Sequence, residues 1–169
     1  KTPHLDQLAR EGMRFMDMHS TSSVCTPTRY SILTGEYAWR TSLKTGVLWS
    51  YGPLMIPDQK ETVAKLLKRN GYQTAVVGKW HLGLDWQLKS DLQPEQIIQN
   101  DWSLITDYKE EIVDFSKNPS KGPTQVGFDY SYILPASLDI PPYVYLENEK
   151  FIQPINDRLP SAFGAFVGW

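Results

Sequence analysis

The only cysteine of the chain stands in the sequence Cys25-Thr26-Pro27-Thr28-Arg29. A cysteine that serves packing usually has apolar neighbours, because a free thiol behaves as a small hydrophobic group. Here polar residues and a proline surround the thiol, and Arg29 lies within one helical turn of it. If a helix begins near Pro27, its free N–H groups favour an anion beside Cys25. The pattern therefore predicts a reactive side chain at the edge of an oxyanion pocket.

A second polar pair lies in the sequence GKWHLG, from Gly78 to Gly83. Lys79 and His81 follow a short apolar segment that predicts a strand, and side chains two apart on a strand share one face. Open α/β sheets carry their sites at the carboxyl ends of strands, so we expect this pair to line a site. An ammonium group suits developing negative charge, and a histidine transfers protons near neutral pH.

The elements that must position these residues are predicted from caps and periodicity. Thr2-Pro3 and Gly12 frame one helix, Pro27 and Gly35 a second, and the amphipathic segment 61–71 a third. Alternating or apolar segments predict strands at 13–20, 72–78, 128–134 and 143–151. A helix followed by a tight turn and a buried strand indicates an α/β fold with a three-layer arrangement.

The composition is that of a globular domain. The chain has 169 residues, 41% hydrophobic and 21% charged, with a net charge of −2. This charge gives no global attraction to nucleic acid. No apolar run reaches the ~18 residues of a membrane span. A single cysteine excludes an internal disulfide.

The two motifs together resemble those of the type I, formylglycine-dependent sulfatases of the alkaline phosphatase superfamily. Residues 25–29, followed by Thr34-Gly35, are similar to the family signature Cys-x-Pro-Ser/Thr-Arg, and GKWHLG is similar to the second sulfatase motif. The segments TPHLDQLAREGMRF and GFDYSYILPASLDIPPYVYLEN also resemble sulfatase segments, the latter those of arylsulfatase-like bacterial members. The resemblance implies that residues 1–169 are part of an N-terminal catalytic domain with the sulfatase fold.

The resemblance also implies roles for individual residues. Cys25 would be oxidised to formylglycine by a maturation enzyme, and the hydrate would be the nucleophile and a ligand of one divalent cation, usually calcium. Arg29 would stabilise the nucleophile, Lys79 would bind a sulfate oxygen, and His81 would hydrogen-bond the hydrate. Asp139 and Tyr143 are candidates for shaping a substrate pocket, although two prolines and a tyrosine more often indicate a rigid turn. The remaining metal ligands and the first strand are expected outside this chain, before Lys1 or after Trp169.

The leading hypothesis is a sulfuric ester hydrolase acting on sulfated carbohydrates or aryl sulfates, secreted or periplasmic as in the family. A phosphonate monoester or phosphodiester hydrolase of the same superfamily remains an alternative, because both ester types are tetrahedral oxyanions. A non-catalytic relative that binds sulfated glycans is a second alternative. A cysteine hydrolase using Cys25 and His81 is disfavoured, because Arg29 and Lys79 suit an anionic substrate better than a neutral acyl group. Nothing predicts a nucleic-acid partner or a membrane span.

Overall fold

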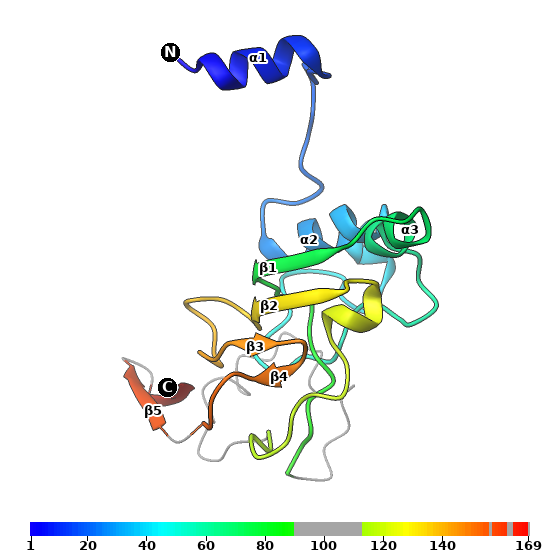
Figure 1. The fold of residues 1–169 in the computed structure, drawn as a ribbon. Coiled ribbons are helices and arrows are strands. Elements are labelled where there is room, and N and C mark those ends of the chain that lie inside the picture. Colours follow the sequence, from blue (N-terminus) through cyan, green and yellow to red (C-terminus); the bar gives the residue numbers. More distant parts are fainter. Residues whose placement is uncertain (90–112, 156, 162–163, 169) are drawn as a thin grey trace.

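The computed structural model describes residues 1–89, 113–155, 157–161 and 164–168 (Figure 1). Its central feature is a mixed sheet in the order β1-β2-β3-β4. Strand β1, Ala75–Lys79, runs parallel to β2, Tyr130–Leu134, and the register pairs the last residues Lys79 and Leu134. The antiparallel strands β3, Leu146–Glu147, and β4, Lys150–Phe151, complete the sheet. A separate antiparallel pair consists of β5, Asp157–Ser161, and β6, Gly164–Gly168.

Three α-helices confirm the three predicted ones. Helix α1, Pro3–Glu11, buries none of its residues and projects away from the rest of the chain (Figure 1). Helix α2, Cys25–Thr34, begins two residues earlier than the predicted Pro27 and ends at Gly35, whose φ of 71° is the left-handed cap that glycine adopts readily. Helix α3, Val63–Arg69, lies beside α2. The combination of these helices with the sheet confirms the α/β class.

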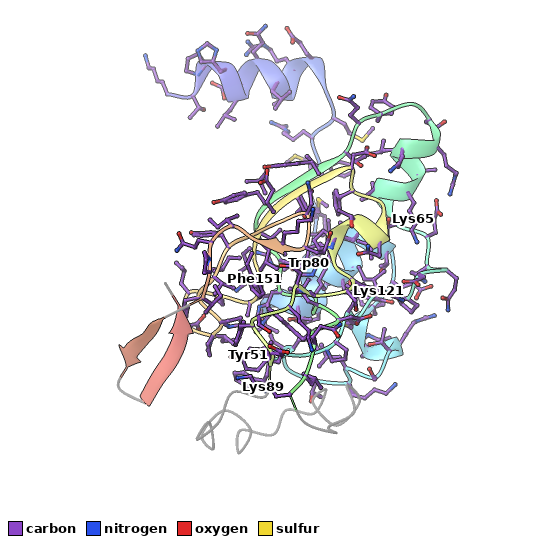
Figure 2. The ribbon with its side chains drawn as sticks, turned by 60° about the horizontal axis from the view of Figure 1, so that its bottom comes forward. Tyr51, Lys65, Trp80, Lys89, Lys121 and Phe151 are labelled. Atoms are coloured by element: carbon purple, nitrogen blue, oxygen red, sulfur yellow. The ribbon has the colours of Figure 1, made fainter. Side chains whose placement is uncertain are left out.

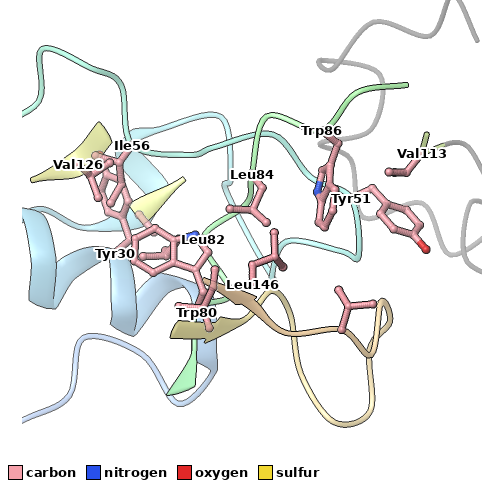
Figure 3. Packing of buried hydrophobic residues seen from close by; sticks show 13 residues of the cluster. Tyr30, Tyr51, Ile56, Trp80, Leu82, Leu84, Trp86, Val113, Val126 and Leu146 are labelled. Atoms are coloured by element: carbon pink, nitrogen blue, oxygen red, sulfur yellow. The ribbon is translucent and has the colours of Figure 1, made fainter. Parts of the chain in front are cut away.

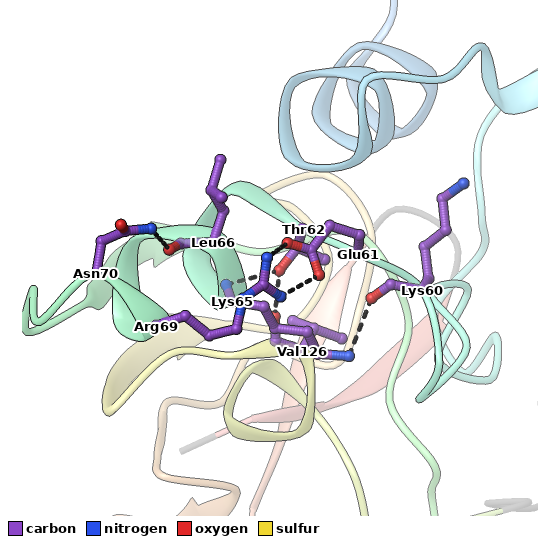
Figure 4. Close-up of polar contacts among 8 residues, drawn as sticks. All are labelled: Lys60, Glu61, Thr62, Lys65, Leu66, Arg69, Asn70 and Val126. Atoms are coloured by element: carbon purple, nitrogen blue, oxygen red, sulfur yellow. Dashed lines mark hydrogen bonds and ion pairs between the residues drawn. The ribbon is translucent and has the colours of Figure 1, made fainter.

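Helix α3 is held at its start by one side chain. The Thr62 hydroxyl accepts a hydrogen bond from the Lys65 N–H at 3.1 Å and donates to the Val126 carbonyl at 2.6 Å, as Figure 4 shows. Val126 belongs to η3, a short 3-10 helix at Pro123–Val126, and a second 3-10 helix, η1, spans Ala38–Arg40. The cap of α3 therefore also ties this helix to the segment that leads into β2.

The predicted strand at 13–20 is wrong. No strand forms there, and Met13, Phe15 and Met16 are all exposed. The alternation of side chains in this segment is suitable for a strand, but a strand is stable only when its backbone groups pair with a neighbour. Among the residues that the structure describes, none offers a ladder to this segment.

The predicted single strand at 143–151 is also wrong, because the chain reverses within it. Asn148 and Glu149 have φ of 48° and 62° and connect β3 to β4 as a hairpin. Asparagine tolerates the left-handed region, whereas glutamate does so at a cost. The Glu149 carboxylate accepts hydrogen bonds from the backbone N–H and the hydroxyl of Thr124, at 2.9 and 2.7 Å. These bonds hold the unfavourable turn residue in place.

The core lies between the sheet and α2 and continues under the loops that follow β1 (Figure 3). Trp80 is 2% exposed, packs edge-on against Phe128, and lies in the interior of the molecule in Figure 2. Its indole N–H donates to the Gly83 carbonyl at 2.7 Å. Because Trp80 stands between Lys79 and His81 in sequence, its burial anchors the segment that carries both polar side chains.

Candidate active site

The carboxyl ends of β1 and β2 meet at one edge of the sheet, because the strands are parallel. The pairing continues past the strands: the Trp80 N–H donates to the Leu134 carbonyl, and the His81 N–H donates to the Pro135 carbonyl, both at 2.9 Å. The segment after β2 therefore runs beside the GKWHLG segment. This brings Ser137 to the edge that carries Lys79, as the rule for open α/β sheets predicts.

Cys25 and Lys79 meet at this edge. Cys25 is the first residue of α2 and its thiol is partly buried and free. The Lys79 ammonium lies 3.1 Å from the Cys25 Sγ and 2.9 Å from the Ser137 hydroxyl oxygen. Three segments far apart in the sequence thus converge on one ammonium group. Sequence reasoning missed Ser137, although a polar residue three positions after a predicted buried strand was a usable signal.

Arg29 extends from the next turn of α2 to the same edge. Its Nη1 donates to the Lys79 carbonyl at 2.6 Å. Its Nε–H is buried and has no hydrogen-bond partner among the described residues. Leaving such a charged donor without an acceptor costs about 1–3 kcal/mol or more, so an anionic ligand beside the thiol is a favourable partner. Arg29 and Lys79 thus bring two positive side chains to this edge of the sheet.

His81 is 1% exposed, and its ring is fixed from one side. The ring Nε2 lies 2.8 Å from the Leu48 carbonyl oxygen, which only accepts, so Nε2 carries the proton of the neutral ring. The other nitrogen, Nδ1, is buried without a partner among the described residues. Burial is the main reason that the pKa of His81 is lowered to about 4, and the charges of Lys79 and Arg29 act in the same direction. His81 is therefore neutral at pH 7 and presents Nδ1 as an acceptor.

Asp139 and Tyr143 lie beside these groups. The hydrogen bond from Ser137 is the main reason that the pKa of Asp139 is lowered, and the charges of Lys79 and His81 act in the same direction. Burial and then the charge of Asp139 raise the pKa of Tyr143. The structure thus places Asp139 within electrostatic reach of Lys79 and places Tyr143 near Asp139. A chain of polar contacts runs from the thiol through Lys79 and Ser137 to Asp139.

The arrangement suits an anion better than a cation. Lys79 contacts the Cys25 thiol, and a second positive side chain, Arg29, binds the Lys79 carbonyl. Among the residues that the structure describes, no group of three or more histidine, cysteine, aspartate or glutamate side chains could hold a metal ion. These side chains alone therefore do not form the set of oxygen ligands that calcium requires. Likewise, none of the described helices is long and apolar enough to cross a membrane.

Comparisons with known proteins agree with this geometry. A family model described as Sulfatase matches residues 1–132. An N-acetylgalactosamine-6-O-sulfatase of Bacteroides thetaiotaomicron is 35% identical over 147 residues, which cover 87% of this chain and 24% of that relative. A steryl-sulfatase of Rattus norvegicus is 44% identical over 96 residues, which cover 54% of this chain and 17% of the relative. This chain thus spans about a quarter or less of these relatives.

Solved structures give the same result at the level of the fold. A structure from work on the metabolism of multiple glycosaminoglycans by Bacteroides thetaiotaomicron has a TM-score of 0.67 and 33% identity, and the match covers 96% of this chain and 30% of that one. The structure of Ps i-CgsB in complex with a neocarrahexaose has a TM-score of 0.55 and 21% identity, over 89% of this chain and 31% of that one. The second likeness concerns the fold alone.

Proposed function

This chain belongs to the sulfatase family, and we propose that the protein containing it hydrolyses sulfate esters at the edge formed by Cys25, Arg29, Lys79 and His81. The observation that carries the proposal is the Lys79 ammonium, which lies 3.1 Å from the sulfur of the only cysteine, while Arg29, with its buried Nε–H, binds the Lys79 carbonyl. We propose further that residues 1–169 are part of the N-terminal catalytic domain.

The nucleophile would be residue 25 after its oxidation to formylglycine by a maturation enzyme. A hydrated aldehyde supplies what a thiol lacks, since it releases sulfate by re-forming its carbonyl group. Lys79 and Arg29 bind the sulfate oxygens and the negative charge that builds on them, which is the kind of fixed electrostatic stabilisation that lowers a barrier most. His81 Nδ1 accepts a hydrogen bond from the hydrate in this proposal, and Ser137 orients the Lys79 ammonium.

The substrate proposed is a sulfated carbohydrate or an aryl sulfate. The relative from Bacteroides thetaiotaomicron is named for a sulfated amino sugar, and this supports the carbohydrate. Asp139 accepts hydrogen bonds from sugar hydroxyl groups in this proposal, and Tyr143 packs on the ring from the neighbouring turn. The negative charge that Asp139 retains through its contact with Ser137 fits such a role.

The cofactor proposed is one divalent cation, calcium by family resemblance, with the modified residue 25 as its ligand from this chain. Secretion or a periplasmic location is proposed on the same ground.

The test is a pair of measurements on the full-length protein, produced together with a formylglycine-generating enzyme. Mass spectrometry of the peptide containing Cys25 should show a loss of ~18 Da, the difference between thiol and aldehyde, outside the ordinary ladder of cysteine oxidation. The protein should then hydrolyse an aryl sulfate much faster than an aryl phosphodiester, and Cys25→Ala should abolish both activities.

Each other result points elsewhere. Faster turnover of the phosphodiester would favour the phosphonate monoester or phosphodiester hydrolase. An unmodified Cys25 with retained binding of sulfated glycans would favour a binding protein. Activity that survives Cys25→Ala would refute the assignment of the nucleophile.

A further inference from the structure

Thr26 stands between Cys25 and Pro27, at the position that the signature leaves undefined. Its side chain is nevertheless fully buried, and its hydroxyl both donates and accepts a hydrogen bond. Thr26 is 0% exposed. Its hydroxyl donates to the His81 carbonyl at 2.9 Å and accepts from the Leu48 N–H at 3.2 Å. A threonine in the first turn of a helix usually bonds locally or to solvent. Here the hydroxyl instead reaches a residue 55 positions away.

A third hydrogen bond, between Leu48 and the side chain of His81, connects these two into a closed cycle. The Leu48 carbonyl lies 2.8 Å from Nε2 of His81, so Leu48 contacts Thr26 through its N–H and His81 through its carbonyl. One hydroxyl therefore touches both the backbone of His81 and the residue that holds its ring. The ring of hydrogen bonds joins the start of α2, the loop at Leu48 and the end of β1.

The backbone of His81 needs such support. Its φ of 56° lies in the left-handed region, which costs a non-glycine residue about 1–3 kcal/mol unless its surroundings fix it. The Pro135 carbonyl holds its N–H at 2.9 Å, and Thr26 holds its carbonyl. Both the N–H and the carbonyl of His81 are thus hydrogen-bonded to other segments.

We propose that Thr26 is a positioning residue, which holds His81 and the Leu48 carbonyl so that Nε2 carries the ring proton and Nδ1 stays an acceptor in the site. Only the expected change in turnover rests on the proposed function. Without the hydroxyl, the Leu48 loop and the end of β1 lose their common partner, and the ring of His81 is free to rotate or to change its tautomer. The charged groups that face the ring are Lys79, Arg29 and Asp139.

The experiment compares Thr26→Val, which has the same shape without the hydroxyl, with Thr26→Ser, which keeps it. The full-length protein is labelled with ¹⁵N-histidine, and His81→Gln assigns the ring signals. The wild type and Thr26→Ser should show His81 protonated on Nε2 alone, whereas Thr26→Val should show a mixture of tautomers. Turnover of an aryl sulfate per formylglycine should fall about 10–100-fold in Thr26→Val, as for a group displaced by about 1 Å, with little change in KM.

Three results would overturn the proposal. The first is a wild-type His81 that carries its proton on Nδ1, and this result needs no variant to fold. The second is a Thr26→Val protein with the wild-type tautomer and turnover. The third is a Thr26→Ser protein that loses as much as Thr26→Val. If the wild type fails to hydrolyse aryl sulfates, the proposed function fails, but the ring signals still decide whether Thr26 positions His81.

Discussion

Lowering the pH should destabilise the folded protein through His81, because the folded state keeps this ring neutral. Its pKa falls from 6.5 to about 4 on folding, mainly through burial. Between these values the unfolded chain binds a proton that the folded chain does not. The stabilisation is therefore complete above pH 6.5 and is lost as the pH falls toward 4. At about 1.4 kcal/mol per pKa unit, the free energy of unfolding falls by ~2 kcal/mol at pH 5 and by ~3 kcal/mol near pH 4.

His81→Gln is the matched control, since a glutamine amide can donate to the Leu48 carbonyl but does not titrate. Urea unfolding of both proteins at several pH values, followed by tryptophan fluorescence, gives the difference in their free energies of unfolding. Between pH 7 and pH 4, the free energy of unfolding of the wild type should fall by ~3 kcal/mol more than that of the variant. Groups that titrate in both proteins cancel in this comparison. A difference that stays constant, or that changes only above pH 7, would refute the account of a buried neutral ring.

Three further results follow from the contacts above. Thr62→Ala removes the cap of α3 and should lower the free energy of unfolding by about 0.5–2 kcal/mol in urea titrations. Gly83→Ala should lower the melting temperature far more than Gly71→Ala. Both glycines have positive φ, but only at Gly83, of the two, would a Cβ meet backbone, 1.9 Å from the Pro53 carbonyl oxygen. Equal melting temperatures of the two variants would contradict this. Lys79→Met should lower aryl sulfate turnover per formylglycine by about 10²–10³-fold, and an unchanged kcat would remove Lys79 from the chemistry.

The parts of this structure that could be predicted are those governed by local signals. Pro3 and Gly12 were sufficient to predict α1, and the amphipathic spacing that ends at Asn70-Gly71 was sufficient for α3. The short apolar segment before GKWHLG was sufficient for β1. The resemblance assigned Cys25 and Lys79 to one site, and the structure places the Lys79 Nζ 3.1 Å from the Cys25 Sγ.

The parts that failed depend on partners distant in the sequence. Residues 13–20 alternate like a strand, but pattern alone does not supply a neighbouring strand. The reversal at Asn148-Glu149 depends on a carboxylate that Thr124 holds. Ser137 enters the site because two parallel strands end at the same edge. The left-handed backbone of His81 is held by an acceptor and a donor from two other segments, the Pro135 carbonyl and the Thr26 hydroxyl.

The sequence separation between the residues of the site determines how far apart in time they leave the ribosome. Lys79 follows Cys25 by 54 residues, and Ser137 follows Lys79 by 58. At ~5–20 residues per second, Cys25 leaves the ribosome about 3–11 s before Lys79. Ser137 follows Lys79 after a similar interval. During the first interval, neither Lys79 nor the strand β2 has left the ribosome. The nascent chain therefore exposes an accessible thiol that the folded protein partly encloses.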